Sequence, residues 1–274
     1  MDARERFTFV MSQAPQAISL DEAALLVAAE EYPHLDVATY QGRLDAMARA
    51  VEPRLQRELE PVRLAGLLSD YLFGHLGFRG NVAEYYDPRN SLLNDVLDRR
   101  VGIPITLAIV YVSVGARLGL PLAGVSFPGH FLVTYRASPD PLFLDPFNQG
   151  RILRESDFRL LHLERFGPEA RFDPALLRPA GPHEVIARLL RNLKYVYAAR
   201  EDFPRAVRCS ERILLVTAQP EERRDLGILL ARDGRVHEAT AHLQQYLAEV
   251  PEAPDRAQVE AQVWRLWQQM RRLS

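Results

Sequence analysis

The sequence has one cysteine and one lysine among its 274 residues, and long apolar runs are missing from it. The lone cysteine, Cys209, allows neither an intrachain disulfide nor a metal site made of several thiolates. The lone lysine, Lys194, means that the remaining basic residues are all arginine. The uncharged stretch at residues 101–116 is shorter than the roughly 20 residues of a membrane-spanning helix.

The chain also has no large excess of charge of one sign, because its 34 basic residues nearly balance its 36 acidic residues and the net charge is −2. Without a basic excess we expect neither nucleic acid nor a membrane surface as a partner. The first residues carry charges and no continuous apolar segment, which is unlike a signal peptide. We therefore expect a cytoplasmic protein, and the sequence leaves its oligomeric state open.

The first third of the chain carries helical patterns. Apolar residues at spacings of three and four predict helices over 19–31, 36–52, 62–76 and 91–100. Ser19 and Glu22 have the spacing of a capping box, and Pro53 is expected to end the second helix. The loop between the last two helices, residues 81–90, is polar and aromatic.

Residues 99–151 are the most apolar part of the sequence, and the rest of the chain is organised around them. Pro104 fits the first turn of a helix that has no polar face, so this helix should be buried on most sides. Short β-like runs follow at 122–127, 131–135, 142–144 and 151–153. These predict an antiparallel sheet packed on the helix, an α+β domain over residues 1–178.

Residues 183–274 carry helical patterns and no strand signal. They repeat at an interval of 33 residues, which pairs Leu193 with Leu226, Tyr197 with Leu230, Ala206 with Ala239, and Ile213 with Tyr246. This interval is typical of tetratricopeptide-like helix pairs. We expect an all-α module of two such pairs and a terminal helix, whose usual use in recognition implies a protein or peptide partner.

His130 precedes one β-like run and Asp145 ends the next. A helix followed by a histidine and then an acid is the chain order of thiol enzymes of the papain and transglutaminase type. In such enzymes the histidine holds the proton of the nucleophile and the acid fixes the histidine tautomer. The alternative is a half-buried strand histidine that is hydrogen-bonded for structural reasons.

Four segments of this chain resemble the transglutaminase-like core: VLDRRVGI (96–103), RLGLP (117–121), Gly129-His130 and Leu144-Asp145-Pro146. The likeness is to the bacterial SirB-type branch, which joins such a core to a C-terminal tetratricopeptide-like region. It implies that His130 and Asp145 are the catalytic histidine and acid. In active members a cysteine begins the central helix.

The position of that cysteine can be counted in two ways. Forward from Gly102 it falls on Pro104, and backward from Gly119 it falls on Ile105. Neither side chain is a nucleophile. Thr106 is the nearest hydroxyl and a candidate nucleophile, although a threonine in a first helical turn also bonds to the local backbone.

The other candidates are binding residues. Asn94, Arg99, Tyr85 and Tyr86 are expected to line the same cleft as His130, whereas Asn90 suits turn hydrogen bonding. Cys209 shares a helical face with Ala206 and Ile213 and is predicted to be buried. The histidines lack metal-ligand spacing and there is no glycine-rich phosphate loop, so we expect no metal or cofactor.

Two functions follow from these observations. In the first, the chain is a non-catalytic transglutaminase-like protein, a pseudoenzyme that binds a protein or peptide as a scaffold. In the second, it is a cysteine-less hydrolase or acyltransferase in which His130 and Asp145 act on amide or ester substrates. The missing cysteine favours the first function, because the members of a catalytic triad act as a unit.

Overall fold

The computed structural model describes residues 2–56, 58–137, 141–167 and 169–273. The chain divides into two compact units, Met1–Leu189 and Leu190–Ser274. The division falls within helix α8 (Pro182–Ala199), a few residues after the change of composition in the sequence. As predicted, helices and a small sheet make up the first part and helices alone the second. Within the described residues, no helix is long and apolar enough to cross a membrane.

The N-terminal helices of unit 1 are α1 (Ala3–Met11), α2 (Leu20–Ala29), α3 (Val37–Leu55), α4 (Pro61–Ser69) and α5 (Leu93–Arg99), with a π-helical turn after α4. The predicted capping box is wrong, because the Ser19 hydroxyl donates to Asp21 and Glu22 pairs with Arg6 instead. The predicted stop at Pro53 is also wrong. The helix α3 continues to Leu55, whose buried side chain anchors the last turn.

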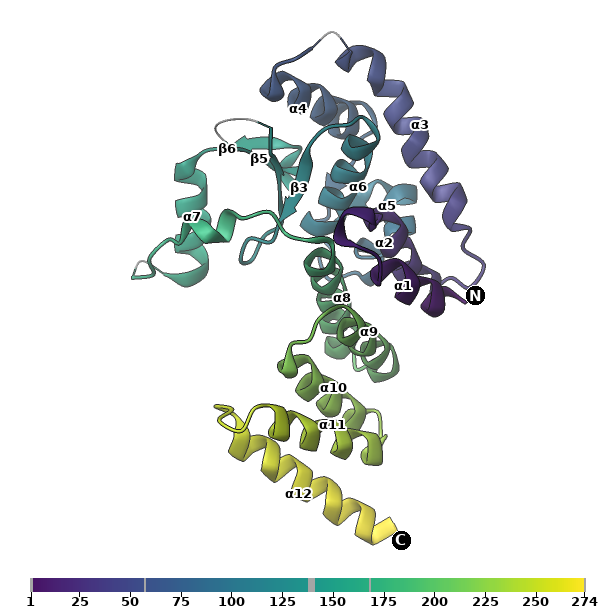
Figure 1. Ribbon diagram of the computed structural model, residues 1–274, viewed down its shortest axis with the longest axis vertical. Helices are drawn as coiled ribbons and strands as arrows, with labels where there is room; N and C mark the ends of the chain where they lie inside the picture. The colour runs from purple at the N-terminus through teal and green to yellow at the C-terminus, as the bar shows by residue number, and fades with distance from the viewer. Residues whose placement is uncertain (1, 57, 138–140, 168, 274) are drawn as a thin grey trace. The chain divides into compact units, whose positions relative to one another are not determined.

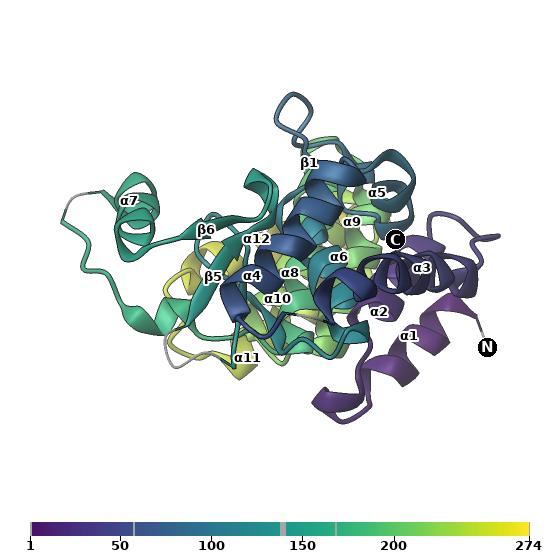
Figure 2. The same cartoon turned by 90° about the horizontal axis from the view of Figure 1, so that it is seen from above.

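Helix α6 (Pro104–Arg117) is the centre of unit 1, and all its residues from Pro104 to Gly115 are buried, as the missing polar face predicted. It contacts α2, α3 and α5, as well as strands β3 and β4. Figure 1 shows these helices on one side of α6 and the sheet on the other, and Figure 2 shows unit 1 from above. Gly115 permits the close approach to β3, because a Cβ there would lie 2.2 Å from Leu122 Cδ1.

The sheet is antiparallel, as predicted, with the order β3 (Leu122–Val125), β4 (Leu132–Tyr135), β5 (Leu142–Asp145) and β6 (Arg151–Leu153). Phe143 and Phe158 pack edge to face with ring centroids 5.0 Å apart, and they join the sheet to α7 (Glu155–Phe166) in a second apolar cluster. Two short strands, β1 (Arg79–Gly80) and β2 (Val101–Gly102), pair in parallel, and β2 lies directly before α6.

Unit 2 contains the end of α8 and helices α9 (Phe203–Val216), α10 (Pro220–Arg232), α11 (Val236–Glu249) and α12 (Arg256–Leu273). Each helix from α9 onward packs on the next (Figure 1). The residues paired by the 33-residue repeat are all buried, which explains why the period is readable in the sequence. Cys209 is buried as predicted.

A buried ion cluster ties α8 to α10 inside unit 2. The Glu222 carboxylate is nearly inaccessible and accepts from Arg191 Nε at 2.5 Å and Lys194 Nζ at 2.6 Å. Lys194 also donates to Asp225 at 2.9 Å. Two cations thus offset the cost of burying the Glu222 charge.

Candidate functional site

The structure brings His130 and Asp145 together. Strands β4 and β5 pair with Val133 opposite Leu144, so Asp145 ends β5 beside the start of β4 and the turn that carries His130. His130 Nε2 lies 2.9 Å from Asp145 Oδ2, and the two side chains are 14% and 5% exposed. The imidazole N–H does not point straight at the oxygen, so the contact is close but not linear. Nδ1 is left as the ring nitrogen away from the carboxylate.

The Asp145 carboxylate is fixed by the turn that follows it. Its Oδ1 accepts the backbone N–H groups of Phe147 and Asn148, and its Oδ2 accepts the Asn148 side-chain amide at 2.7 Å. Burial alone would raise the pKa of Asp145, but His130 and the Asn148 bonds outweigh it and lower the pKa below its usual value. Asp145 is therefore held as an anion facing the imidazole.

Arg188 of α8 holds the turn that carries His130. One of its guanidinium nitrogens donates to the Ser126 hydroxyl at 2.8 Å and the Phe127 carbonyl at 2.9 Å. The other donates to the backbone carbonyl of His130 itself at 2.8 Å. The guanidinium also lies 5.5 Å from the Phe131 ring centroid. A planar fork with several donors suits this task, so Arg188 positions His130 through the backbone.

A chain of aromatic rings leads from the imidazole to the polar loop. The Phe147 ring stands edge-on to His130 with centroids 6.1 Å apart, and Tyr85 stands edge-on to Phe147 at the same distance. Tyr85 and Tyr86 contact each other at 5.3 Å, and both are exposed. Phe147 lies so close to Gly80 that a Cβ there would be 2.5 Å from the ring. The predicted binding residues Tyr85 and Tyr86 thus join the His130 surroundings through Phe147.

The start of α6 offers no reactive side chain. Pro104 and Ile105, the two residues counted for the cysteine position, are buried and apolar. The Thr106 side chain is 0% exposed. Its hydroxyl donates to the Asn90 carbonyl at 2.8 Å and accepts the N–H of Ile103 at 3.1 Å. Thr106 therefore fastens the loop before α6 to the helix.

Asn90 organises the polar loop, as its turn chemistry predicted. Its side-chain amide donates to the carbonyls of Glu84 and Tyr85, and its Oδ1 accepts from Asn81. The β1–β2 ladder holds the same loop beside the start of α6. The two exposed tyrosines therefore stand on a loop with a fixed backbone.

Asn94 and Arg99 lie on α5, and in the described part of the chain neither hydrogen-bonds to His130. Asn94 is buried and its Oδ1 accepts no hydrogen bond from a described residue. Arg99 Nη2 lies 3.6 Å from the Asp87 carboxylate. Burial alone would raise the pKa of Asp87, but Arg89 and Arg99 lower it below its usual value. These two candidates thus belong to the loop region, not to the immediate contacts of the imidazole.

Sequence reasoning missed Phe147, Asn148 and Arg188. The first two follow Asp145-Pro146 directly, and an acid that caps the next turn was a usable signal. Arg188 is 58 residues from His130 and had no local signal. Within the described residues, no group of three His, Cys, Asp or Glu side chains is placed to hold a metal ion.

Comparison with known proteins places this site in a family. The model of the transglutaminase-like superfamily matches residues 38–191, which is more than half of the chain and includes α6, His130 and Asp145. The chain belongs to the transglutaminase-like superfamily. A tetratricopeptide repeat model matches residues 193–263, the helices of unit 2. The resemblance drawn from the sequence is thereby confirmed for the transglutaminase-like domain and for the repeats.

Several relatives share both parts of this transglutaminase-like protein. A UPF0162 protein of Xylella fastidiosa is 43% identical over 86% of this chain and 85% of its own length. A UPF0162 protein of Pseudomonas aeruginosa is 35% identical over 90% of this chain and 84% of its own length. Mouse F-box only protein 21 is 33% identical over 38% of this chain but only 18% of its own length. No solved structure matches the chain.

Proposed function

We propose that this chain is a non-catalytic transglutaminase-like protein that binds a protein or peptide partner as a scaffold. The observation that carries the proposal is the chemistry at the start of α6. Pro104 and Ile105 are buried hydrocarbon, and the Thr106 hydroxyl is buried and bonded to backbone groups. A nucleophile must be accessible and close to a base, and none of these three side chains meets both conditions.

Two further features support a binding role. Tetratricopeptide repeats generally mediate protein–protein interaction, and such a model matches residues 193–263. A stretch of 114 aligned residues is also shared with a longer mammalian protein, mouse F-box only protein 21, where it makes up 18% of the length.

The test is a turnover assay on a panel of amide and ester substrates. We expect the wild-type chain to show no hydrolysis or acyl transfer above a blank without protein. Turnover that disappears in both His130→Ala and Asp145→Asn, with each variant folded by circular dichroism, would contradict the proposal. A partner isolated with the wild-type chain should bind His130→Ala with unchanged affinity.

The second candidate function is a cysteine-less hydrolase, and the His130–Asp145 contact favours it. In this reaction the imidazole takes a proton from a water molecule that attacks a carbonyl carbon, and returns it to the leaving group. Asp145 stabilises the imidazolium in between. Here the expected result is turnover that is lost in His130→Ala. If every detected activity survives that substitution, this candidate fails.

A further inference from the structure

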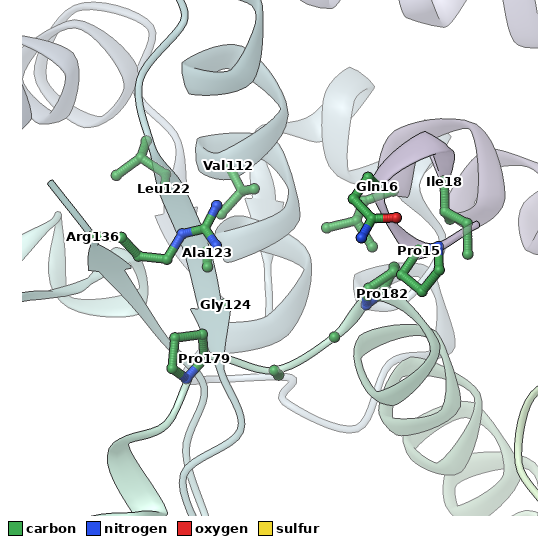
Figure 3. A pocket seen from close by; sticks show the side chains of 13 residues that line it. Pro15, Gln16, Ile18, Val112, Leu122, Ala123, Gly124, Arg136, Pro179 and Pro182 are labelled. Carbon is green, nitrogen blue, oxygen red and sulfur yellow. The ribbon is translucent and has the colours of Figure 1, made fainter. Parts of the chain in front are cut away.

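A cavity of about 510 Å³ lies in unit 1, apart from the residues around His130. It is bounded by the segment before α2, by Val112 of α6, by β3, and by the segment 179–182 that leads into α8 (Figure 3). Its volume is within the range of ligand-binding clefts, about 300–1,000 Å³. Most of its lining is apolar, with proline contributed from both sides by Pro15, Pro179 and Pro182.

Arg136 is the one charged side chain in this lining. It is exposed, and its guanidinium makes no hydrogen bond or ion pair with any residue that the structure describes. Figure 3 shows it extending across β3 beside Ala123. The guanidinium of Arg188, elsewhere in unit 1, donates to three oxygens. A cation over an apolar cavity that pairs with none of the described residues favours a ligand with a carboxylate.

The edge of β3 offers backbone groups to the same cavity. Arg136 N donates to the Pro121 carbonyl, so Ala123 and Val125, two and four residues further on, also face β4 with their N–H and C=O groups. Leu122 and Gly124 therefore direct theirs outward. The Ala180 N–H donates a hydrogen bond to the Gly124 carbonyl at 2.8 Å. The Leu122 carbonyl and the Gly124 N–H bond to no described residue, so one residue of an added segment can bond to both.

We propose that this cavity binds an extended peptide segment of a partner protein, apolar in character and carrying an acidic side chain that pairs with Arg136. The peptide adds to the edge of β3, a recognition mode in which backbone bonds supply affinity and side-chain contacts supply specificity. The acid is a side chain rather than a C-terminal carboxylate, because side chains of an added strand leave the plane of the sheet as Arg136 does. This site stands whether or not His130 is catalytic.

The experiment is a selection from a displayed library of random heptapeptides with both ends blocked, using the full chain as bait. We expect enriched peptides to share one Asp or Glu flanked by apolar residues. One enriched peptide is then synthesised with blocked ends, and its affinity is measured by fluorescence anisotropy for the wild type, Arg136→Gln, Arg49→Gln and His130→Ala. Arg49 is an exposed arginine on α3 and serves as the matched control.

The proposal requires that Arg136→Gln weaken binding by about fivefold, the upper range for a partly exposed ion pair. Arg49→Gln and His130→Ala should leave the affinity unchanged, and the bound peptide should slow amide exchange at residues 122–124. Selection without acidic enrichment would overturn the proposal. So would equal affinity for Arg136→Gln, which would place the peptide elsewhere, for instance on unit 2. Loss of binding in His130→Ala alone would show that the peptide binds at the His130 site instead.

Discussion

At the scale of single residues, the Thr106 hydroxyl joins two backbone segments beside the position counted for the cysteine. Its side chain is fully buried and joins Asn90 to Ile103 across the start of α6. Gly102 makes room for it, because a Cβ at Gly102 would lie 2.7 Å from the hydroxyl oxygen. The hydroxyl keeps the polar loop attached to the helix.

Substitutions at Thr106 separate the hydroxyl from the methyl group. Thr106→Val leaves a buried carbonyl and a buried N–H without partners, which costs about 1–3 kcal/mol in the free energy of unfolding. Thr106→Ser keeps the hydroxyl and loses one buried methyl, about 0.8 kcal/mol. In urea denaturation, Thr106→Val should therefore have a lower free energy of unfolding than Thr106→Ser. The reverse order would show that the hydroxyl bonds contribute little.

Asp145 gives a pH dependence whose sign follows from its pKa. Its pKa in the folded chain is lowered from 3.8, so the ionised carboxylate stabilises the folded state. The contribution is complete above the unfolded value, at about pH 5 and higher, and is lost as pH falls through the folded pKa. Asp145→Asn should be about 1–3 kcal/mol less stable than wild type at pH 7.

Chemical denaturation at a series of pH values checks this expectation. The stability gap between wild type and Asp145→Asn should narrow as the solution is acidified below pH 4. Asparagine can still accept the Phe147 and Asn148 backbone N–H groups through its one oxygen, but it loses the charge and the acceptor of the Asn148 side-chain amide. A gap that stays constant down to pH 3 would mean that the carboxylate charge does not stabilise the fold.

At the scale of elements, α8 fixes the geometry of a turn on a different part of the chain. Arg188 donates to three oxygens of the β3–β4 turn, among them the His130 carbonyl. Arg188→Ala and Arg188→Lys should both loosen the turn, because a single ammonium cannot span those oxygens. We expect a loss of about 1.5–3 kcal/mol and faster amide exchange over residues 126–131.

The matched control is Arg159→Ala on α7. Arg159 pairs with Glu155 one helical turn away, and both side chains are exposed. Its loss should change stability by no more than about 0.5 kcal/mol and leave residues 126–131 unaffected. Equal exchange in wild type and Arg188→Lys would show that a single ammonium is sufficient to hold the turn.

Two glycines within helices predict opposite effects of the same substitution. A Cβ at Gly227 of α10 would lie 2.7 Å from Leu243 Cγ and 3.2 Å from the Ala239 carbonyl, where α11 packs. Gly227→Ala should cost about 1–3 kcal/mol. Gly66 of α4 has open space, so Gly66→Ala should gain about 0.5–1 kcal/mol. Thermal melts decide: a melting temperature that rises for both variants would show that α11 can move aside.

The elements also show what the sequence could predict and why. The sheet was predictable because each strand is bounded by turn residues, and adjacent antiparallel strands bring His130 and Asp145 together by register alone. The predicted end of α3 was too early, because the low helix propensity of Pro53 contains no information about the burial of Leu55. Arg188 was not predictable, because its contacts depend on where the end of one domain folds back onto a distant turn.

At the scale of the whole molecule, its two-part organisation was readable because each part has its own pattern. The repeat of 33 residues reflects positions that are buried at equal intervals in unit 2. The cavity beside Arg136 had no such pattern, because it is lined by segments that lie far apart in the sequence. Periodic burial is thus visible in a sequence, whereas a cavity between distant segments is not.

The ion cluster between α8 and α10 has a consequence for chemical labelling. Lys194 carries the sole side-chain amine of the chain, is 13% exposed, and donates to Glu222 and Asp225. An amine that is buried between two carboxylates is shielded from acylating reagents, so acetylation at this position requires α8 and α10 to separate transiently. The acetylation rate of Lys194, followed by mass spectrometry, therefore measures how often unit 2 opens locally.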